Sequence, residues 1–223
     1  MVENISPGAS ARNARVVLFD FDGTLSLIRS GWMKVMVPMM VEILAGLKTG
    51  EKEAELQAVV EEFVWRLTGK ETIYQMIALA EAVEVRGGKP LEASAYKKMY
   101  LASGTDEIYM KEEARLLGIT QYFDGGVYGA LDDYKSFSKA ILIQRILASA
   151  DFQGNQFLGF GDGYVEIEEV KNVGGVAVGV ASEEPACTEV DQWKRLRLIG
   201  VGADYIVPNF LCREELVSTL FPG

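Results

Sequence analysis

The chain contains no histidine among its 223 residues. This absence excludes the catalytic pairs Ser–His and Cys–His and removes the most common side-chain ligand of zinc. Acid and base catalysis would therefore fall to carboxylates, lysine or tyrosine. Cysteine is also scarce, since only Cys187 and Cys212 occur and they lie far apart in the sequence. This pattern gives little support to a disulfide or a cysteine metal site and favours a reduced, cytoplasmic setting.

Long apolar runs and an excess of basic residues are missing as well. The most apolar segment, 32–44, is interrupted by Lys34, Pro38 and Glu42, well short of the roughly 20 apolar residues that a membrane-spanning helix needs. We therefore expect a packed helix there and no membrane partner. The formal net charge is −10, which disfavours a nucleic-acid partner because phosphate backbones require a basic face. The cluster Lys194-Arg195-x-Arg197 is most simply a solvated helix face.

Length and composition indicate a folded, two-part chain. With 49% hydrophobic residues the chain is not a disordered one, and 223 residues suffice for one substantial core and a smaller subdomain. The segment 1–13 has no apolar stretch, so it does not predict a signal peptide. Its Pro, Gly and Ser content predicts a frayed tail.

The most informative segment is Asp20-Phe-Asp-Gly-Thr-Leu25, which directly follows an apolar strand over 15–19. Asp20 and Asp22 would point the same way if the strand ran on, because side chains in a strand repeat with a period of two. Gly23 would let the backbone turn and expose a backbone amide. Two carboxylates beside an exposed amide suit a metal ion and a phosphate.

Two further polar residues occupy chemically useful positions later in the chain. Ser103 directly follows the apolar run 99–102, whereas Thr105 is better placed to cap the next helix. Lys139 stands at the start of an amphipathic helix, and Lys135 is a second candidate for a lysine at this place.

An acidic pair follows another apolar strand. Asp162 comes after the strand expected over 156–160, and Glu166 stands four residues further on. One turn of helix would place the two on the same face. In this order, the four segments resemble the motifs of the haloacid dehalogenase-like (HAD) hydrolase superfamily, in the form carried by its phosphatases and phosphomutases. That family often has Asp as the second acidic residue of the last motif, so Glu166 departs from the pattern and has a longer side chain.

The resemblance implies an Mg²⁺ site and a covalent mechanism. Asp20 and Asp162 would bind the ion through carboxylates and Asp22 through its backbone carbonyl, while Glu166 would hold a metal-bound water or orient its neighbours. Asp20 would attack phosphorus to give an aspartyl-phosphate, and Asp22 would act as acid and then base. Lys139 would neutralise charge near Asp20. The other residues implied to bind the phosphoryl group are Gly23, Thr24, Ser103 and Gly104.

The resemblance further implies a Mg²⁺-dependent phosphomonoester hydrolase for a small phosphorylated metabolite, of the sugar phosphate or phosphoglycolate type. Haloacid dehalogenases resemble this fold but typically lack the second Asp and the metal, so Asp22 favours phosphate esters. A phosphomutase of the β-phosphoglucomutase type remains an alternative, because it shares the motifs. A catalytically silent regulatory domain is a second alternative, which the intact set of motif residues disfavours.

The periodicity predicts an α/β fold with a helical insertion. Apolar residues recur at helical spacing over 31–47, 51–67 and 71–86, which predicts an α-helical cap over 28–97 between the first two motifs. The rest, 1–27 and 98–223, would form the catalytic core. Helix and strand patterns alternate there, and this predicts a Rossmann-like three-layer parallel sheet. The strands expected after Ser103 are 126–128, 156–160, 175–180 and 205–207.

The cap would select the substrate. Lys70 or Arg29 could bind a second anionic group and Trp32 could stack on a sugar or base, but the simpler alternatives are solvated charges and a core tryptophan. The resemblance implies a few tens of further residues before Ser103 that this sequence does not contain. Either the cap is unusually compact or a segment near 93–99 is absent, and the second is favoured because 96–100 leaves little room for a return to the sheet. We expect a monomer or a homodimer.

Overall fold

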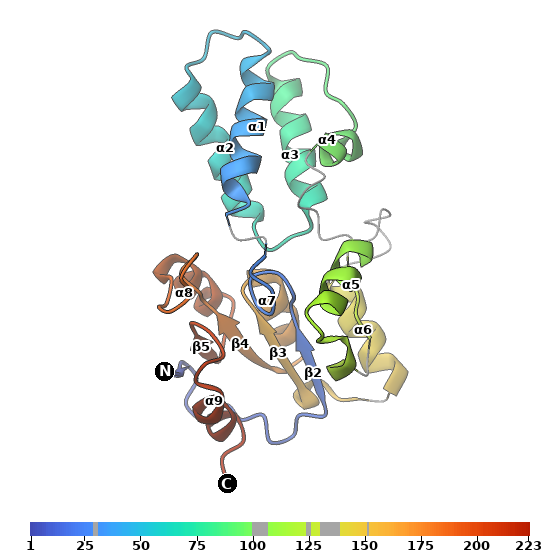
Figure 1. Cartoon of the computed structure of the whole chain (residues 1–223), viewed down its shortest axis with the longest axis vertical. Helices are drawn as coiled ribbons and strands as arrows, with labels where there is room; N and C mark the ends of the chain where they lie inside the picture. The colour runs from blue at the N-terminus through green and yellow to red at the C-terminus, as the bar shows by residue number, and fades with distance from the viewer. Residues whose placement is uncertain (29–30, 100–106, 124–125, 130–138, 151) are drawn as a thin grey trace. The chain divides into compact units, whose positions relative to one another are not determined.

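The computed structural model describes residues 1–28, 31–99, 107–123, 126–129, 139–150 and 152–223. The chain divides into two compact units, which are coloured by residue number in Figure 1. The core unit comprises Met1–Ser30 and Lys135–Gly223, and the helical unit comprises Gly31–Tyr134. The cap limits expected from the sequence, 28–97, stay a prediction.

A five-stranded sheet, in the order β1-β5-β4-β3-β2, runs through the described part of the core unit. β2, β3, β4 and β5 pair in parallel, and the short β1 pairs antiparallel with β5. β3 is buried along its whole length, as a strand covered on both faces should be. The strands are β1 (Glu3–Asn4), β2 (Val16–Phe19), β3 (Phe157–Gly161), β4 (Val176–Val180) and β5 (Tyr205–Val207).

Helices cover both faces of this sheet (Figure 1). α6, α7 and α8 pack side by side, and their apolar residues join one core cluster with Phe157 of β3. Leu158, the next residue of β3, belongs to the opposite cluster, where α9 and the N-terminal segment pack. This alternation confirms the predicted Rossmann-like α/β core. The helices are α6 (Lys139–Ala150), α7 (Tyr164–Asn172), α8 (Gln192–Gly200) and α9 (Arg213–Leu220), with a 3₁₀ turn at Gly154–Gln156.

Two local expectations for strands and tails were wrong. Residues 126–129 form no strand, because Gly126 adopts φ +104° and its amide donates to Phe123 O in a turn. The N-terminal segment is tied down rather than frayed. Glu3 forms an ion pair with Arg195, the hydroxyl of Tyr205 donates to Ala9 O, and β1 covers an otherwise open edge of β5.

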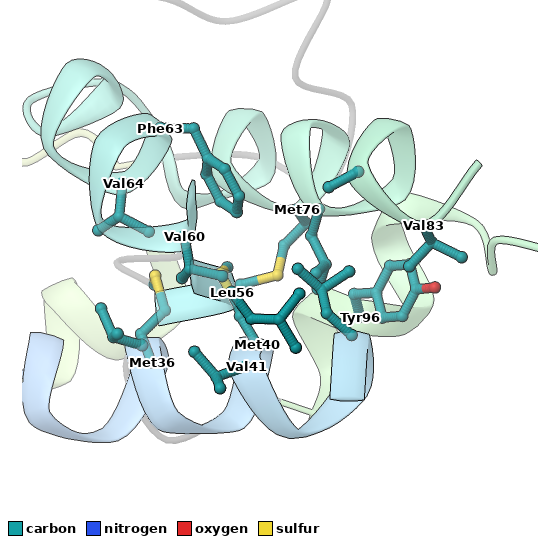
Figure 2. Packing of buried hydrophobic residues seen from close by; sticks show 14 residues of the cluster. Met36, Met40, Val41, Leu56, Val60, Phe63, Val64, Met76, Val83 and Tyr96 are labelled. Atoms are coloured by element: carbon teal, nitrogen blue, oxygen red, sulfur yellow. The ribbon is translucent and has the colours of Figure 1, made fainter. Parts of the chain in front are cut away.

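The helical unit has an apolar core of its own. Its first three helices match the predicted segments with slightly trimmed ends, and Figure 2 shows their side chains interdigitating. Met36 and Met40 of α1, Val60 and Phe63 of α2, and Met76 of α3 are all buried. The segment 32–44 is thus mostly a packed helix. No helix in the described part of the chain is long and apolar enough to cross a membrane. These helices are α1 (Met33–Ala45), α2 (Glu53–Leu67) and α3 (Thr72–Val85).

The segment that follows is helical rather than extended. α4 spans Ala93–Met99, and the hydroxyl of its buried Tyr96 accepts a hydrogen bond from the Leu91 amide at 3.1 Å. The apolar run 99–102 before Ser103 lies outside the described residues, apart from Met99 at the end of α4. The compact-cap and missing-segment alternatives therefore both stay predictions. Two more elements of this unit are α5 (Glu107–Leu116) and the 3₁₀ turn η1 (Thr120–Tyr122).

Gly159 of β3 is required by the close approach of α7. A Cβ built at this position would lie 2.4 Å from Cγ2 of the fully buried Val170. We expect Gly159→Ala to lower the free energy of unfolding by about 1–3 kcal/mol, because the packed interior must shift to admit a methyl group. Urea denaturation measures this loss.

Gly200→Ala is the matched control, since a Cβ there meets no atom within 4 Å at the end of α8. Both changes remove the same freedom from the unfolded chain, so the difference between them isolates packing. Equal stability of the two variants would refute the close β3–α7 contact.

Candidate active site

The first acidic residues stand in a tight turn at the carboxyl end of β2. The Asp20 amide donates to Phe160 O at 2.8 Å, which extends the β2–β3 pairing by one residue. Directly before Asp20, Phe19 stacks on Phe160 with ring centroids 4.5 Å apart, so the turn starts from a rigid base. The strand ends at Phe19, so the condition under which Asp20 and Asp22 would point the same way is not met. Instead Asp22 forms an isolated bridge with Ser26.

Gly23 brings this turn against the loop that follows β3. It adopts φ +74°, and a Cβ there would lie 2.2 Å from Asp162 Oδ2. Only glycine fits this position, because its conformation and the close carboxylate both exclude a side chain. The Gly23 amide donates to Ser26 O at 2.8 Å. Gly23 therefore supplies a turn and space for Asp162, while its role toward a phosphoryl group stays a prediction.

Asp20, Asp162 and Glu166 form an acidic cluster, and Lys139 pairs with two of its members. Lys139 is the first residue of α6, and its Nζ lies 2.7 Å from Asp20 Oδ1 and also contacts Glu166 Oε1. Glu166 sits in the first turn of α7, where the positive end of the helix dipole favours a carboxylate. Gly161 makes room for it, since a Cβ there would lie 2.9 Å from Glu166 Cβ.

The expected arrangement of Asp162 and Glu166 on one helix face is not formed. α7 begins at Tyr164 with Gly163 as its N-cap, so Asp162 precedes the helix. Asp162 instead approaches Gly23, and Glu166 approaches Lys139. Both carboxylates still belong to the carboxyl edge of the sheet, beside Asp20.

Lys194 is a further residue of this site that the sequence gave no reason to select. Its Nζ lies 3.0 Å from Glu184 Oε1 and 3.4 Å from Asp162 Oδ2, with the side chain only 16% exposed. The reading of 194–197 as one solvated face was wrong, because Arg195 pairs with Glu3 and Arg197 lies 4.4 Å from the ring of Tyr164. No local motif marks Lys194, since its partners come from separate loops.

A comparison with protein families bears on this constellation. The model of the haloacid dehalogenase-like hydrolases matches residues 14–174, which include Asp20, Lys139, Asp162 and Glu166. The chain belongs to the haloacid dehalogenase-like hydrolases. Among solved structures, it is similar to L-2-haloacid dehalogenase from Xanthobacter autotrophicus, with 16% identity, a TM-score of 0.45, and coverage of 92% of this chain and 98% of that chain. A search of curated proteins found no match.

In this HAD-like hydrolase the acidic cluster carries an excess of negative charge. Burial, and then the charge of Asp20, raises the pKa of Asp162 to about 7, although Lys194 and Lys139 act in the opposite direction. Glu166 is 3% exposed, and its Oε2 makes no hydrogen bond within the described part of the chain. Crowded carboxylates with an orphaned oxygen form a donor set that suits a hard divalent cation.

The cluster is not a preformed cage. No three acidic, cysteine or histidine side chains lie close enough to hold a metal ion within the ranges that the structure describes. Lys139 and Lys194 stand against three of the carboxylates instead. A cation binding here would share the carboxylates with the two ammonium groups, so the donor chemistry fits while the side chains would have to adjust.

The remaining candidate residues lie in different parts of the structure, and some lie outside the described residues. Thr24 is 6% exposed, and its buried hydroxyl makes no hydrogen bond within the described residues. Lys70 belongs to the helical unit, where its Nζ lies 5.5 Å from the ring centroid of Tyr74. Trp32 packs against the core of that unit. The candidates outside the described residues are Arg29, Ser103, Gly104, Thr105 and Lys135.

The raised pKa of Asp162 predicts a pH-dependent stability. An Asp whose pKa moves from the ordinary 3.8 to about 7 on folding binds its proton more tightly in the folded state. Metal-free protein should therefore lose stability as the pH rises from about 4 to about 7. Asp162→Asn lacks this loss, so its stability relative to wild type should improve by on the order of 2 kcal/mol between about pH 5 and about pH 8.

Urea denaturation in the presence of a chelator measures this difference. The exposed Glu168→Gln on α7 is the control and should show no such change with pH. A difference between Asp162→Asn and wild type that is independent of pH would contradict the predicted burial of charge.

Proposed function

We propose that this hydrolase is a Mg²⁺-dependent phosphomonoesterase that acts on a small phosphorylated metabolite through an aspartyl-phosphate on Asp20. The observation that carries the proposal is the position of the Asp20 carboxylate, 2.7 Å from Lys139 Nζ and beside the charge of Asp162. A nucleophile in this place has the positive charge of Lys139 beside it, and a phosphate dianion needs such a charge in order to approach a carboxylate. The presence of Asp22 supports phosphate esters over haloacids as substrates.

The donor set supports Mg²⁺ as the cofactor. Asp20 and Asp162 would hold it through carboxylates and Asp22 through its main-chain carbonyl, with Glu166 orienting the neighbouring groups. When bound, Mg²⁺ would supply positive charge that offsets the repulsion between the carboxylate nucleophile and the phosphate ester.

The protein's own residues would carry both chemical steps. A carboxylate oxygen of Asp20 bonds to phosphorus while the bond between phosphorus and the leaving oxygen breaks, and Asp22 donates a proton to that oxygen. Asp22 then takes a proton from water, whose oxygen attacks phosphorus. The bond between Asp20 and phosphorus breaks, and inorganic phosphate leaves. Lys139 and the Thr24 hydroxyl would stabilise the phosphoryl oxygens throughout.

The test is phosphate release from a panel of sugar phosphates, nucleotides, phosphoglycolate and an aryl phosphate, with and without Mg²⁺. We expect release that requires Mg²⁺ and falls more than about 1,000-fold in Asp20→Asn, because the nucleophile is lost. Glu168→Gln makes the same carboxylate-to-amide change at an exposed site and should keep wild-type activity.

Other outcomes distinguish the alternatives. Wild-type turnover by Asp20→Asn would overturn the assignment of the nucleophile. Halide release from 2-haloacids without phosphate release would make the protein a dehalogenase. Phosphoryl transfer between positions of one sugar, without net hydrolysis, would indicate a mutase.

A further inference from the structure

Lys194 is held next to the acidic cluster by anchored backbone. The Asp191 side chain caps α8 by accepting a hydrogen bond from the Lys194 amide at 2.8 Å. The Asp191 amide in turn donates to Ala181 O, directly after β4. These bonds fix the start of α8 to the carboxyl edge of the sheet, so the position of Lys194 is set by the core and not by a mobile surface.

Two carboxylates share the Lys194 ammonium group. Burial alone would lower the pKa of Lys194, but Asp162 and Glu184 outweigh it and raise that pKa, so the side chain is charged. Glu184 is the nearer partner, at 3.0 Å against 3.4 Å for Asp162 Oδ2. The ammonium group can therefore give up Asp162 and still keep a countercharge.

Asp162 is one of the carboxylates that the proposed function gives to Mg²⁺. Two cations beside one carboxylate repel each other, and the repulsion is strong where water is largely excluded. A divalent ion at Asp162 must therefore work against Lys194. Glu184 limits this repulsion, because the ammonium group can pair with Glu184 in place of Asp162.

We propose that Lys194 is a built-in competitor of the divalent cation, which neutralises Asp162 in the metal-free protein and is retained by Glu184 when the cation binds. This inference rests on the proposed function, because that function supplies the cation. It makes Lys194 a positioning residue that tunes the affinity of the site. A structural ion pair would instead support the fold without affecting the cation.

Calorimetric titration of Mg²⁺ into metal-free protein tests the proposal without any turnover. At about pH 9, where fewer protons compete for Asp162, and at constant ionic strength, we expect Lys194→Met to bind Mg²⁺ about five- to tenfold more tightly than wild type, because the competing charge is gone. Lys194→Arg keeps the charge and should stay near wild type. Glu184→Gln should weaken Mg²⁺ binding, because Lys194 then has only Asp162 as its partner.

Neighbouring variants control for net charge. Arg195→Met removes one positive charge from the same helix, where the side chain pairs with Glu3, and Glu183→Gln removes one negative charge beside Glu184 at an exposed position. Both should leave the Mg²⁺ affinity nearly unchanged. The melting temperature should also rise more with Mg²⁺ in Lys194→Met than in wild type, since tighter binding gives greater stabilisation.

Two results would overturn the inference in distinguishable ways. If wild type binds Mg²⁺ and Lys194→Met binds it equally or more weakly, Lys194 is a structural partner and the proposed function stands. If wild type binds no Mg²⁺ by calorimetry or by melting temperature, the cation site fails, and both proposals fail with it.

Discussion

The crowding of carboxylates at the carboxyl edge of β2 and β3 is the constraint on which the rest of the site depends. Asp20, Asp162 and Glu166 are brought together by strand ends and a helix start, in a place where burial and mutual repulsion raise the pKa of Asp162 to about 7. Lys139 and Lys194 offset part of this charge. Under the proposed function, a divalent cation would offset the remaining negative charge before an anionic phosphate ester binds.

The core keeps these charges in place through close backbone packing. Gly23, Gly159 and Gly161 each stand where an added Cβ would meet a neighbouring side chain at less than 3 Å. Gly159 lets α7 approach β3, Gly161 admits Glu166, and Gly23 admits Asp162. The stacked rings of Phe19 and Phe160 support the two strand ends from one side. The rigid strands and the glycines, which have no side chains, are therefore as important to the site as its charged groups.

Much of this could be predicted from local sequence. Short apolar runs placed β3, β4 and β5 to within a residue or two, and helical periodicity placed α1, α2 and α3. Asp20, Lys139 and Asp162 were identifiable because each follows a strand or opens a helix in a known order. Lys194 was not, because Asp162 and Glu184 approach it only after folding. The N-terminal tail was misjudged for the same reason, since β1 is stabilised by the edge of β5 and by Arg195.

The most direct test of this account is a crystal structure of the protein with Mg²⁺ and beryllium trifluoride, which mimics a phosphoryl group bonded to a carboxylate. We expect beryllium trifluoride bonded to Asp20 beside Lys139, one Mg²⁺ contacted by Asp20 and Asp162, and Lys194 paired with Glu184 alone. A structure under the same conditions that has no metal between these carboxylates, with Lys194 still against Asp162, would contradict it.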